Sequence, residues 1–263
     1  MNIINTKDKY KSMNSFKIFG AEIINKGLKI NDTLIICDLH FGYETSLNKQ
    51  GLMVPQFQFD KIIESLDNIQ EKANCSRIIL NGDIKHNFGK IDKQEWKEVL
   101  SFLDYLSDIF IDVQIIKGNH DNFLPYITNK RDIPLENSIV LDNYLITHGH
   151  NIPKKIPDNI DTIIIGHEHP CISIRNQERV EKVKSYLTGR WEEYNLIVQP
   201  SFNSISYGSD VLHEKTISPF IKNILDFEVY AIEDDEIYPF GLISDLILID
   251  NEEYQNNNKG GYL

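Results

Sequence analysis

The sequence lacks any apolar run long enough to cross a membrane. Its longest apolar stretches, Leu34–Cys37 and Ile163–Ile165, have the length of β-strands, whereas a membrane-spanning helix needs about 20 apolar residues. The first residues, MNIINTKDKYKSMN, contain no apolar segment of the kind found in signal peptides. We therefore expect no membrane contact and a cytoplasmic location.

Cysteine is also scarce, with only Cys37, Cys75 and Cys171 in 263 residues. The number is odd and no two of them are spaced as C-x-x-C, so neither a disulfide framework nor a zinc–thiolate site is indicated. We expect Cys37 and Cys75, which lie in or beside strand-like runs, to be buried free thiols.

Basic residues are few relative to acidic ones. The chain has 27 Lys and Arg against 39 Asp and Glu, a formal net charge of −12. Such a chain should repel the phosphate backbone of nucleic acid, which argues against a broad basic groove. Bound divalent cations would reverse the sign locally, so a short or single-stranded nucleic acid stays open as a substrate.

Residues 16–250 contain no linker rich in proline, glycine or serine and no internal repeat. We expect a single domain there, with a frayed arm at 1–15 and a disordered tail at 251–263.

Short β-branched runs alternate with helical patterns, which is typical of an α/β fold with some parallel strands. A layered sandwich of two mixed sheets with helices outside fits better than one parallel sheet. The predicted helices are Gln58–Lys72, Lys93–Leu106 and a short one after Asn122. The predicted strands are Thr33–Cys37, Arg77–Leu80, Val113–Ile116, Ile139–Leu141, Tyr144–Thr147, Thr162–Ile165, Tyr194–Val198, Phe227–Ile232 and Leu246–Ile249.

Clusters of Asp, His and Asn directly follow five of these strands, at 38–40, 82–86, 118–121, 148–150 and 166–169. Ligand sites of α/β folds lie just beyond the carboxyl ends of strands, so the clusters should converge on one crevice. Asp38 with His40, and His167 with His169, are i,i+2 pairs that would point to one side of an extended segment and offer two ligands to one site. This mixture of donors suits Mn²⁺, Fe²⁺, Zn²⁺ or Co²⁺ better than Ca²⁺ or Mg²⁺.

The blocks D-x-H, G-D, G-N-H-D, H-G-H and G-H-x-H, in this order over about residues 30–170, resemble the calcineurin-like metallophosphoesterase superfamily. The blocks at 82–89 and 148–150, and S-P-F at 218–220, are similar to those of archaeal phosphoesterases related to the SbcD nuclease. The resemblance implies a four-layer α/β/β/α sandwich. From the SbcD likeness alone, a homodimer is also an expectation.

The resemblance also implies a site with two divalent transition-metal ions, for which we expect Mn²⁺ before Fe, Zn or Co. One ion would be held by Asp38, His40 and His169. The other would be held by Asn119, His148 and His167, and Asp83 would bridge the two. A hydroxide bridging the ions would then attack phosphorus in line.

In the same pattern, His120 would not bind metal but would protonate the leaving oxygen, and Asp121 could orient its loop. His150 competes with His148 as the ligand and would otherwise support the ligands or face the substrate. His86 is either a substrate or supporting residue or a satisfied loop histidine. Lys85 is expected to be a solvated charge rather than a phosphate contact.

The sequence departs from the pattern of the superfamily in two ways, and these departures reduce the range of functions that we expect. The block GDIKHN lacks the Asp-Arg pair of phosphoprotein phosphatases, and only about 80 residues follow His169 before the tail, which leaves no room for a DNA-contacting cap. We therefore predict hydrolysis of a phosphate-ester substrate, as a phosphodiesterase with some nuclease character. The alternatives are a phosphomonoesterase acting on a small metabolite or nucleotide, and a catalytically silent scaffold.

Overall fold

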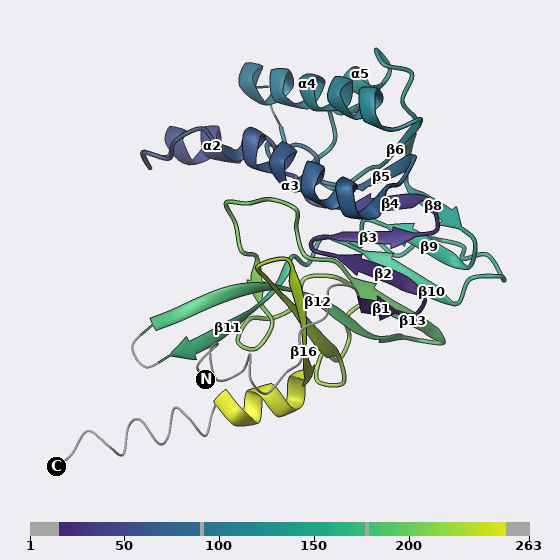
Figure 1. The fold of residues 1–263 in the computed structure, drawn as a ribbon, viewed down its shortest axis with the longest axis vertical. Helices are drawn as coiled ribbons and strands as arrows, with labels where there is room; N and C mark the ends of the chain where they lie inside the picture. Colours follow the sequence, from purple (N-terminus) through teal and green to yellow (C-terminus); the bar gives the residue numbers. More distant parts are fainter. Residues whose placement is uncertain (1–15, 90–91, 177–178, 251–263) are drawn as a thin grey trace.

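The computed structural model describes residues 16–89, 92–176 and 179–250, whose strands form two sheets (Figure 1). Each sheet mixes parallel and antiparallel pairs, which confirms the predicted α/β class with two mixed sheets. The predicted arm at 1–15 and tail at 251–263 lie outside the described residues.

The first sheet is an antiparallel meander that continues into parallel strands. Strands β1 to β4 pair antiparallel, and β4 to β7 pair parallel. In spatial order its strands are β1 (Phe16–Ile18), β2 (Ala21–Ile24), β3 (Gly27–Ile30), β4 (Thr33–Ile36), β5 (Arg77–Asn81), β6 (Asp112–Ile116) and β7 (Leu135–Glu136).

The second sheet has a parallel centre, in which β10 pairs with β9 and β13. Its flanking pairs are antiparallel except for β11 with β14, which is parallel. Its main order is β14 (Ser209–Asp210), β11 (Pro170–Asn176), β12 (Arg179–Trp191), β13 (Tyr194–Val198), β10 (Thr162–Ile165), β9 (Tyr144–Thr147) and β8 (Ser138–Leu141). Strand β15 (Glu228–Glu233) pairs with β12 and with β16 (Glu236–Leu242).

Helices lie outside both sheets (Figure 1). The helices are α2 (Tyr43–Lys49), α3 (Gln58–Ala73), α4 (Lys93–Ile109), α5 (Pro125–Thr128) and a helical segment at 243–250. Helix α3 buries Ile62, Leu66 and Ile69, the i, i+4, i+7 face expected of an amphipathic helix. Each such side chain contributes about 1.5–3 kcal/mol of transfer free energy. No described helix is long and apolar enough to span a bilayer.

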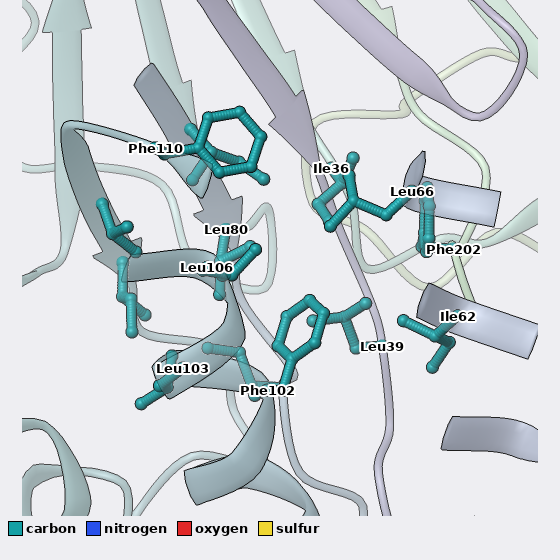
Figure 2. Packing of buried hydrophobic residues seen from close by; sticks show 14 of the residues in the cluster. Ile36, Leu39, Ile62, Leu66, Leu80, Phe102, Leu103, Leu106, Phe110 and Phe202 are labelled. Atoms are coloured by element: carbon teal, nitrogen blue, oxygen red, sulfur yellow. The ribbon is translucent and has the colours of Figure 1, made fainter. Parts of the chain in front are cut away.

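Three hydrophobic cores separate four layers. Leu34 and Ile36 of β4 pack with α3 and α4, whereas Ile35 between them packs against the second sheet. The same alternation on β10 sends Ile164 between the sheets and Ile163 to the outer core that includes residues 243–246. Figure 2 shows side chains of α3, α4, β4 and β5 converging in the first of these cores.

Several parts of the chain differ from prediction; among them, α2, β7, β11, β12, β14 and β16 were not predicted. Residues 246–249, predicted as a strand, are helical, because Ile243, Leu246 and Ile247 recur at the i, i+3, i+4 spacing of a helix face on the outer core. Strands β1 to β3 were not predicted, although Gly20, Asn25 and Asn31 with positive φ mark the tight turns around them.

Candidate metal centre

The five polar strand-end loops meet where the two sheets come together. Three loops follow β4, β5 and β6 of the first sheet, and two follow β9 and β10 of the second. The backbone amide of His167 donates to Asp38 Oδ2 at 3.0 Å, and His148 Nδ1 lies 3.1 Å from the carbonyl oxygen of Asn81. These contacts join the sheets at the carboxyl ends of their parallel strands.

Ligand atoms gather into two adjacent groups. Asp38, His40 and His169 form one, and Asp83, His148 and His167 form the other, with all ligand atoms of a group within 4.8 Å of one another. In the first, His169 Nε2 lies 3.0 Å from Asp38 Oδ1 and 3.3 Å from His40 Nε2.

Asp83 and Asn119 complete this arrangement. Asp83 Oδ2 is 3.3 Å from His148 Nε2 in its own group and 3.9 Å from His40 Nε2 in the other. Asn119 Oδ1 lies 3.1 Å from His148 Nε2. The Asp83 carboxylate therefore stands between the two groups, and the Asn119 amide borders the second.

The i,i+2 reasoning from the sequence was wrong for one pair. Asp38 and His40 share a group, but His167 and His169 fall in different groups. Neither pair is extended: φ is 57° and 50° for the first pair and 64° and 48° for the second. A left-handed turn replaces the strand geometry, so spacing alone could not assign these histidines.

Five candidate residues have left-handed backbones, namely Asp38, His40, Asp83, His167 and His169. Each such non-glycine residue costs about 1–2 kcal/mol relative to the right-handed region. Hydrogen bonds between the loops offset part of this cost, because Asp38 N donates to Gly82 O at 3.1 Å and His40 N donates to Asp83 O at 2.9 Å.

Glycines allow the close approach of the loops. A Cβ added to Gly118 would collide with the Asp83 carboxylate and its backbone nitrogen, and one added to Gly82 would collide with the His148 ring. The glycine of G-N-H-D therefore makes room for the carboxylate between the two groups.

The donor set fits a divalent cation. Asp38 Oδ1 is buried without a hydrogen bond, although it lies 3.0 Å from His169 Nε2. A buried carboxylate oxygen that makes no hydrogen bond, close to imidazole nitrogens, is a donor set that suits borderline metal ions.

The electrostatics of the carboxylates favour the same conclusion. Burial raises the pKa values of Asp38 and Asp83, but neighbouring imidazoles outweigh it and hold both well below the usual range, Asp38 at about 2. Burial acts to lower the pKa of His148, but the charges of Asp83 and Asp38 outweigh burial, so the pKa rises from 6.5 to about 9. The negative field that acts on His148 would also attract a metal ion.

Two other imidazoles are held neutral. Burial, with a further contribution from His169, lowers the pKa of His40 well below its ordinary value. Burial, with a further contribution from His148, lowers the pKa of His167 to about 4. Neutral imidazoles keep the lone pair that a metal ligand must offer.

His120 lies beside the two groups with its ring fixed. Its Nδ1 contacts the carbonyl oxygen of His86, and its Nε2 lies 3.8 Å from Asp83 Oδ2. Asp121 is buried and ties this loop down: Oδ2 accepts from Gly118 N at 2.9 Å, and Oδ1 accepts from Ile84 N at 3.1 Å. His120 Nε2 therefore faces the site while Asp121 braces its loop.

The remaining predicted residues lie at the edge of the site. His86 shares a third group of ligand atoms with His40 and His120. His150 is in none of the groups found among the described residues; its ring centroid lies 5.2 Å from that of His148. Lys85 is buried and donates to the carbonyl oxygen of Asn87, so the prediction that it is solvated was wrong.

Supporting residues from the C-terminal half were not predicted. Asn203 N donates to Asp38 O at 3.2 Å, and Lys184 Nζ donates to Ser201 O at 2.9 Å and Ser206 O at 2.8 Å in the same segment. No local motif marks these residues, because their partners lie far away in the sequence.

Glu168 and Ser218 connect two ligand loops, and the sequence did contain a motif that includes Ser218. The buried Glu168 carboxylate accepts from Ser218 N at 2.9 Å, and Ser218 Oγ donates to Gly149 O at 2.8 Å. Ser218 therefore joins the H-G-H and G-H-x-H blocks, which gives the S-P-F tripeptide noted in the sequence a structural role.

Comparison with protein families agrees with this geometry. The sequence model for calcineurin-like phosphoesterases matches residues 32–163, half of the chain. The chain belongs to the calcineurin-like phosphoesterase family. As a member of this family, it is a metal-dependent phosphoester hydrolase. No protein of curated function matches the sequence.

One solved structure shares the fold. The Pseudomonas putida nuclease MPE matches with a TM-score of 0.57 at 16% identity, over 88% of this chain and 100% of that one. At this identity, the match shows a shared fold and nothing finer. A protein of unknown function from Aquifex aeolicus, AQ665, matches at 17% identity with a TM-score of 0.34, over 56% of this chain and 81% of that one.

Proposed function

We propose that the protein is a phosphodiesterase that uses two divalent transition-metal ions, of which Mn²⁺ is the expected one. Asp38, His40 and His169 would hold one ion, and Asn119, His148 and His167 the other, with Asp83 between them. The observation that carries the proposal is that His120 Nε2 faces two adjacent ligand groups without belonging to either of those two.

When bound, two such ions supply Lewis-acid stabilisation of the phosphoryl oxygens and activate the attacking water. The chain's own residues handle the leaving group. Contact with the His86 carbonyl requires a proton on His120 Nδ1, so Nε2 is the nitrogen that takes up the second proton of the imidazolium ion and donates it to the leaving oxygen. A P–O bond to the water oxygen forms as the bond to the leaving oxygen breaks, and the proton lost by the water balances the one donated.

A diester suits the site better than a monoester because the loops offer few fixed cations. The loops at 38–43, 82–89, 118–121, 148–150 and 166–169 contain no arginine and one lysine, Lys85, which is buried. A monoester dianion needs more positive charge than a diester monoanion. The feature that favours a monoester is the positive charge of Lys117. This charge lowers the pKa of His150, although burial and His148 lower it more.

The deciding experiment compares two chromogenic esters. The purified full-length protein is stripped with a chelator and reloaded with Mn²⁺, Fe²⁺, Zn²⁺, Co²⁺ or Mg²⁺, and its metal content is measured. We expect bis(p-nitrophenyl) phosphate to be hydrolysed faster than p-nitrophenyl phosphate, with Mn²⁺ the best metal. Faster turnover of the monoester would overturn the proposal in favour of the phosphomonoesterase alternative.

The neighbouring nuclease adds one expectation about the substrate. Because the Pseudomonas putida protein of the same fold is described as a nuclease, nucleic-acid phosphodiesters belong among the substrates to be tested. With a net charge of −12, we expect short or single strands to be accepted before duplexes.

A further inference from the structure

The candidate centre meets solvent at those of its side chains that are partly exposed. The side chains of Asp38 and His148 are 0% exposed, whereas those of His120 and His169 are 15% and 18% exposed. A substrate can therefore approach past His120 and His169, and also past Asn119 and His167, which are partly exposed.

Aromatic rings line the His120 side of this opening. The Phe88 ring centroid lies 3.5 Å from that of His120, with the planes inclined at 35°. His86 lies 5.7 Å beyond His120 in a stacked arrangement, and Tyr43 lies 4.5 Å from His86. Four rings therefore follow one another along this side of the site.

Phe88 is held in place although it is not part of a core. The side chain is 53% exposed. Its loop is fixed just before it, because the buried carboxylate of Glu95 accepts from His86 N at 2.9 Å and Asn87 N at 2.8 Å. An exposed phenylalanine on a braced loop beside a catalytic centre is a surface available to a ligand.

The position of His120 tells which part of a substrate would meet this surface. The group that protonates the leaving oxygen must lie next to it. Whatever that oxygen carries then extends past His120, and the ring nearest to His120 is that of Phe88, whose centroid is closer than those of His40 at 4.9 Å and His86 at 5.7 Å. The leaving side of the substrate is therefore the side that reaches Phe88.

We propose that Phe88 is the platform on which the base of the leaving-side nucleoside stacks, and that the substrate is a single-stranded nucleic acid. This inference rests on the proposed phosphodiesterase function. Stacking on aromatic side chains binds single strands without a broad basic surface, which agrees with the net charge of −12. In a duplex, the bases are already stacked and cannot reach such a ring.

A strand with one missing base tests the platform directly. An end-labelled single-stranded oligothymidylate with a single abasic nucleotide is cleaved by the Mn²⁺-loaded full-length protein, and the product termini show which oxygen leaves. We expect cleavage at the bond whose leaving-side nucleoside is abasic to be about tenfold slower than at its neighbours. That ratio equals about 1.4 kcal/mol and lies within the range for one base–aromatic contact.

Two Phe88 variants separate stacking from packing. Phe88→Leu should abolish the discrimination against the abasic position by slowing cleavage at normal positions, while cleavage at the abasic position stays at the wild-type rate. Phe88→Tyr, which keeps the aromatic face, should retain the discrimination. Equal slowing at all positions in Phe88→Leu would show that Phe88 only packs against His120, and would overturn the inference.

The outcomes distinguish this inference from the proposed function. If the wild type hydrolyses bis(p-nitrophenyl) phosphate but cleaves no oligonucleotide, or cleaves the abasic position at the ordinary rate, the platform is refuted and the phosphodiesterase remains. If the wild type hydrolyses neither substrate with any metal, the proposed function itself fails.

Discussion

The amide of His167 donates a hydrogen bond to the carboxylate of Asp38, and the two residues come from different sheets. Asp38 follows β4 and His167 follows β10, 129 positions later in the chain. The same carboxylate offers its other oxygen, Oδ1, to the candidate metal centre. One side chain therefore joins the two halves of the sandwich and aligns their ligand loops.

Removal of the central carboxylate should empty the site. In Asp83→Asn, the group that stands between His148 and His40 loses its charge, and both ligand groups are weakened. We expect bound metal to fall and diester hydrolysis to drop at least about a hundredfold. Metal analysis of the purified variant and steady-state rates measure both effects. Asp108→Asn, an exposed carboxylate on α4, is the control and should behave as wild type.

The acid role of His120 predicts an effect that depends on the leaving group. Loss of a general acid costs about 10²- to 10⁴-fold when the leaving oxygen needs a proton. His120→Gln should therefore suffer this loss on an oligonucleotide, and a much smaller one on bis(p-nitrophenyl) phosphate, whose leaving phenolate is stable unprotonated. Metal content should stay at the wild-type level. An equal loss on both substrates would contradict the acid role.

Gly118 should tolerate no side chain. The Cβ of Gly118→Ala would meet the Asp83 carboxylate, and displacement of a catalytic group by about 1 Å can cost a hundredfold in rate. We expect reduced metal binding and activity in a protein that remains folded by circular dichroism. Gly89→Ala is the matched control, because the added Cβ has no atom within 4 Å among the described residues, its chain neighbours aside. It should keep full activity.

Lys184 should stabilise the segment that supports Asp38. Its Nζ donates to Ser201 O, Ser201 Oγ and Ser206 O, and Lys184→Met leaves those oxygens without this donor. We expect a loss of about 1–3 kcal/mol in the free energy of unfolding, measured by urea denaturation. Lys182→Met, which removes the pair that Lys182 Nζ forms with Glu214, should cost far less. Equal losses would show that Lys184 has no special role.

His213 predicts a pH-dependent contribution to stability. Burial lowers its pKa, but hydrogen bonds to Asp210 and Asp250 outweigh this, so the folded-state pKa lies above the ordinary 6.5. The stabilisation is fully present below pH 6.5 and is lost as the pH rises through the folded-state pKa. The difference in unfolding free energy between wild type and His213→Gln should shrink over that interval. A difference that is constant with pH would contradict the assignment.

The sequence predicted the chemistry better than the geometry. Asp, His and Asn at strand ends are local signals, and each of these loops reaches the site because the carboxyl ends of parallel strands share an edge. The division of His167 from His169 was not predictable from spacing, since it depends on left-handed backbones stabilised by the opposite sheet. Residues such as Lys184 and Asn203 act through tertiary partners, so no pattern near them in the chain reveals their roles.

Catalysis and stability place opposite demands on five residues with left-handed backbones, namely Asp38, His40, Asp83, His167 and His169. Glycine adopts such φ values with little penalty, so His40→Gly or His169→Gly should relieve strain at the position where it removes a ligand. Selection for catalysis must therefore continually oppose mutations that make the protein easier to fold. In a lineage freed from that selection, these five positions are where we expect drift towards glycine and asparagine first.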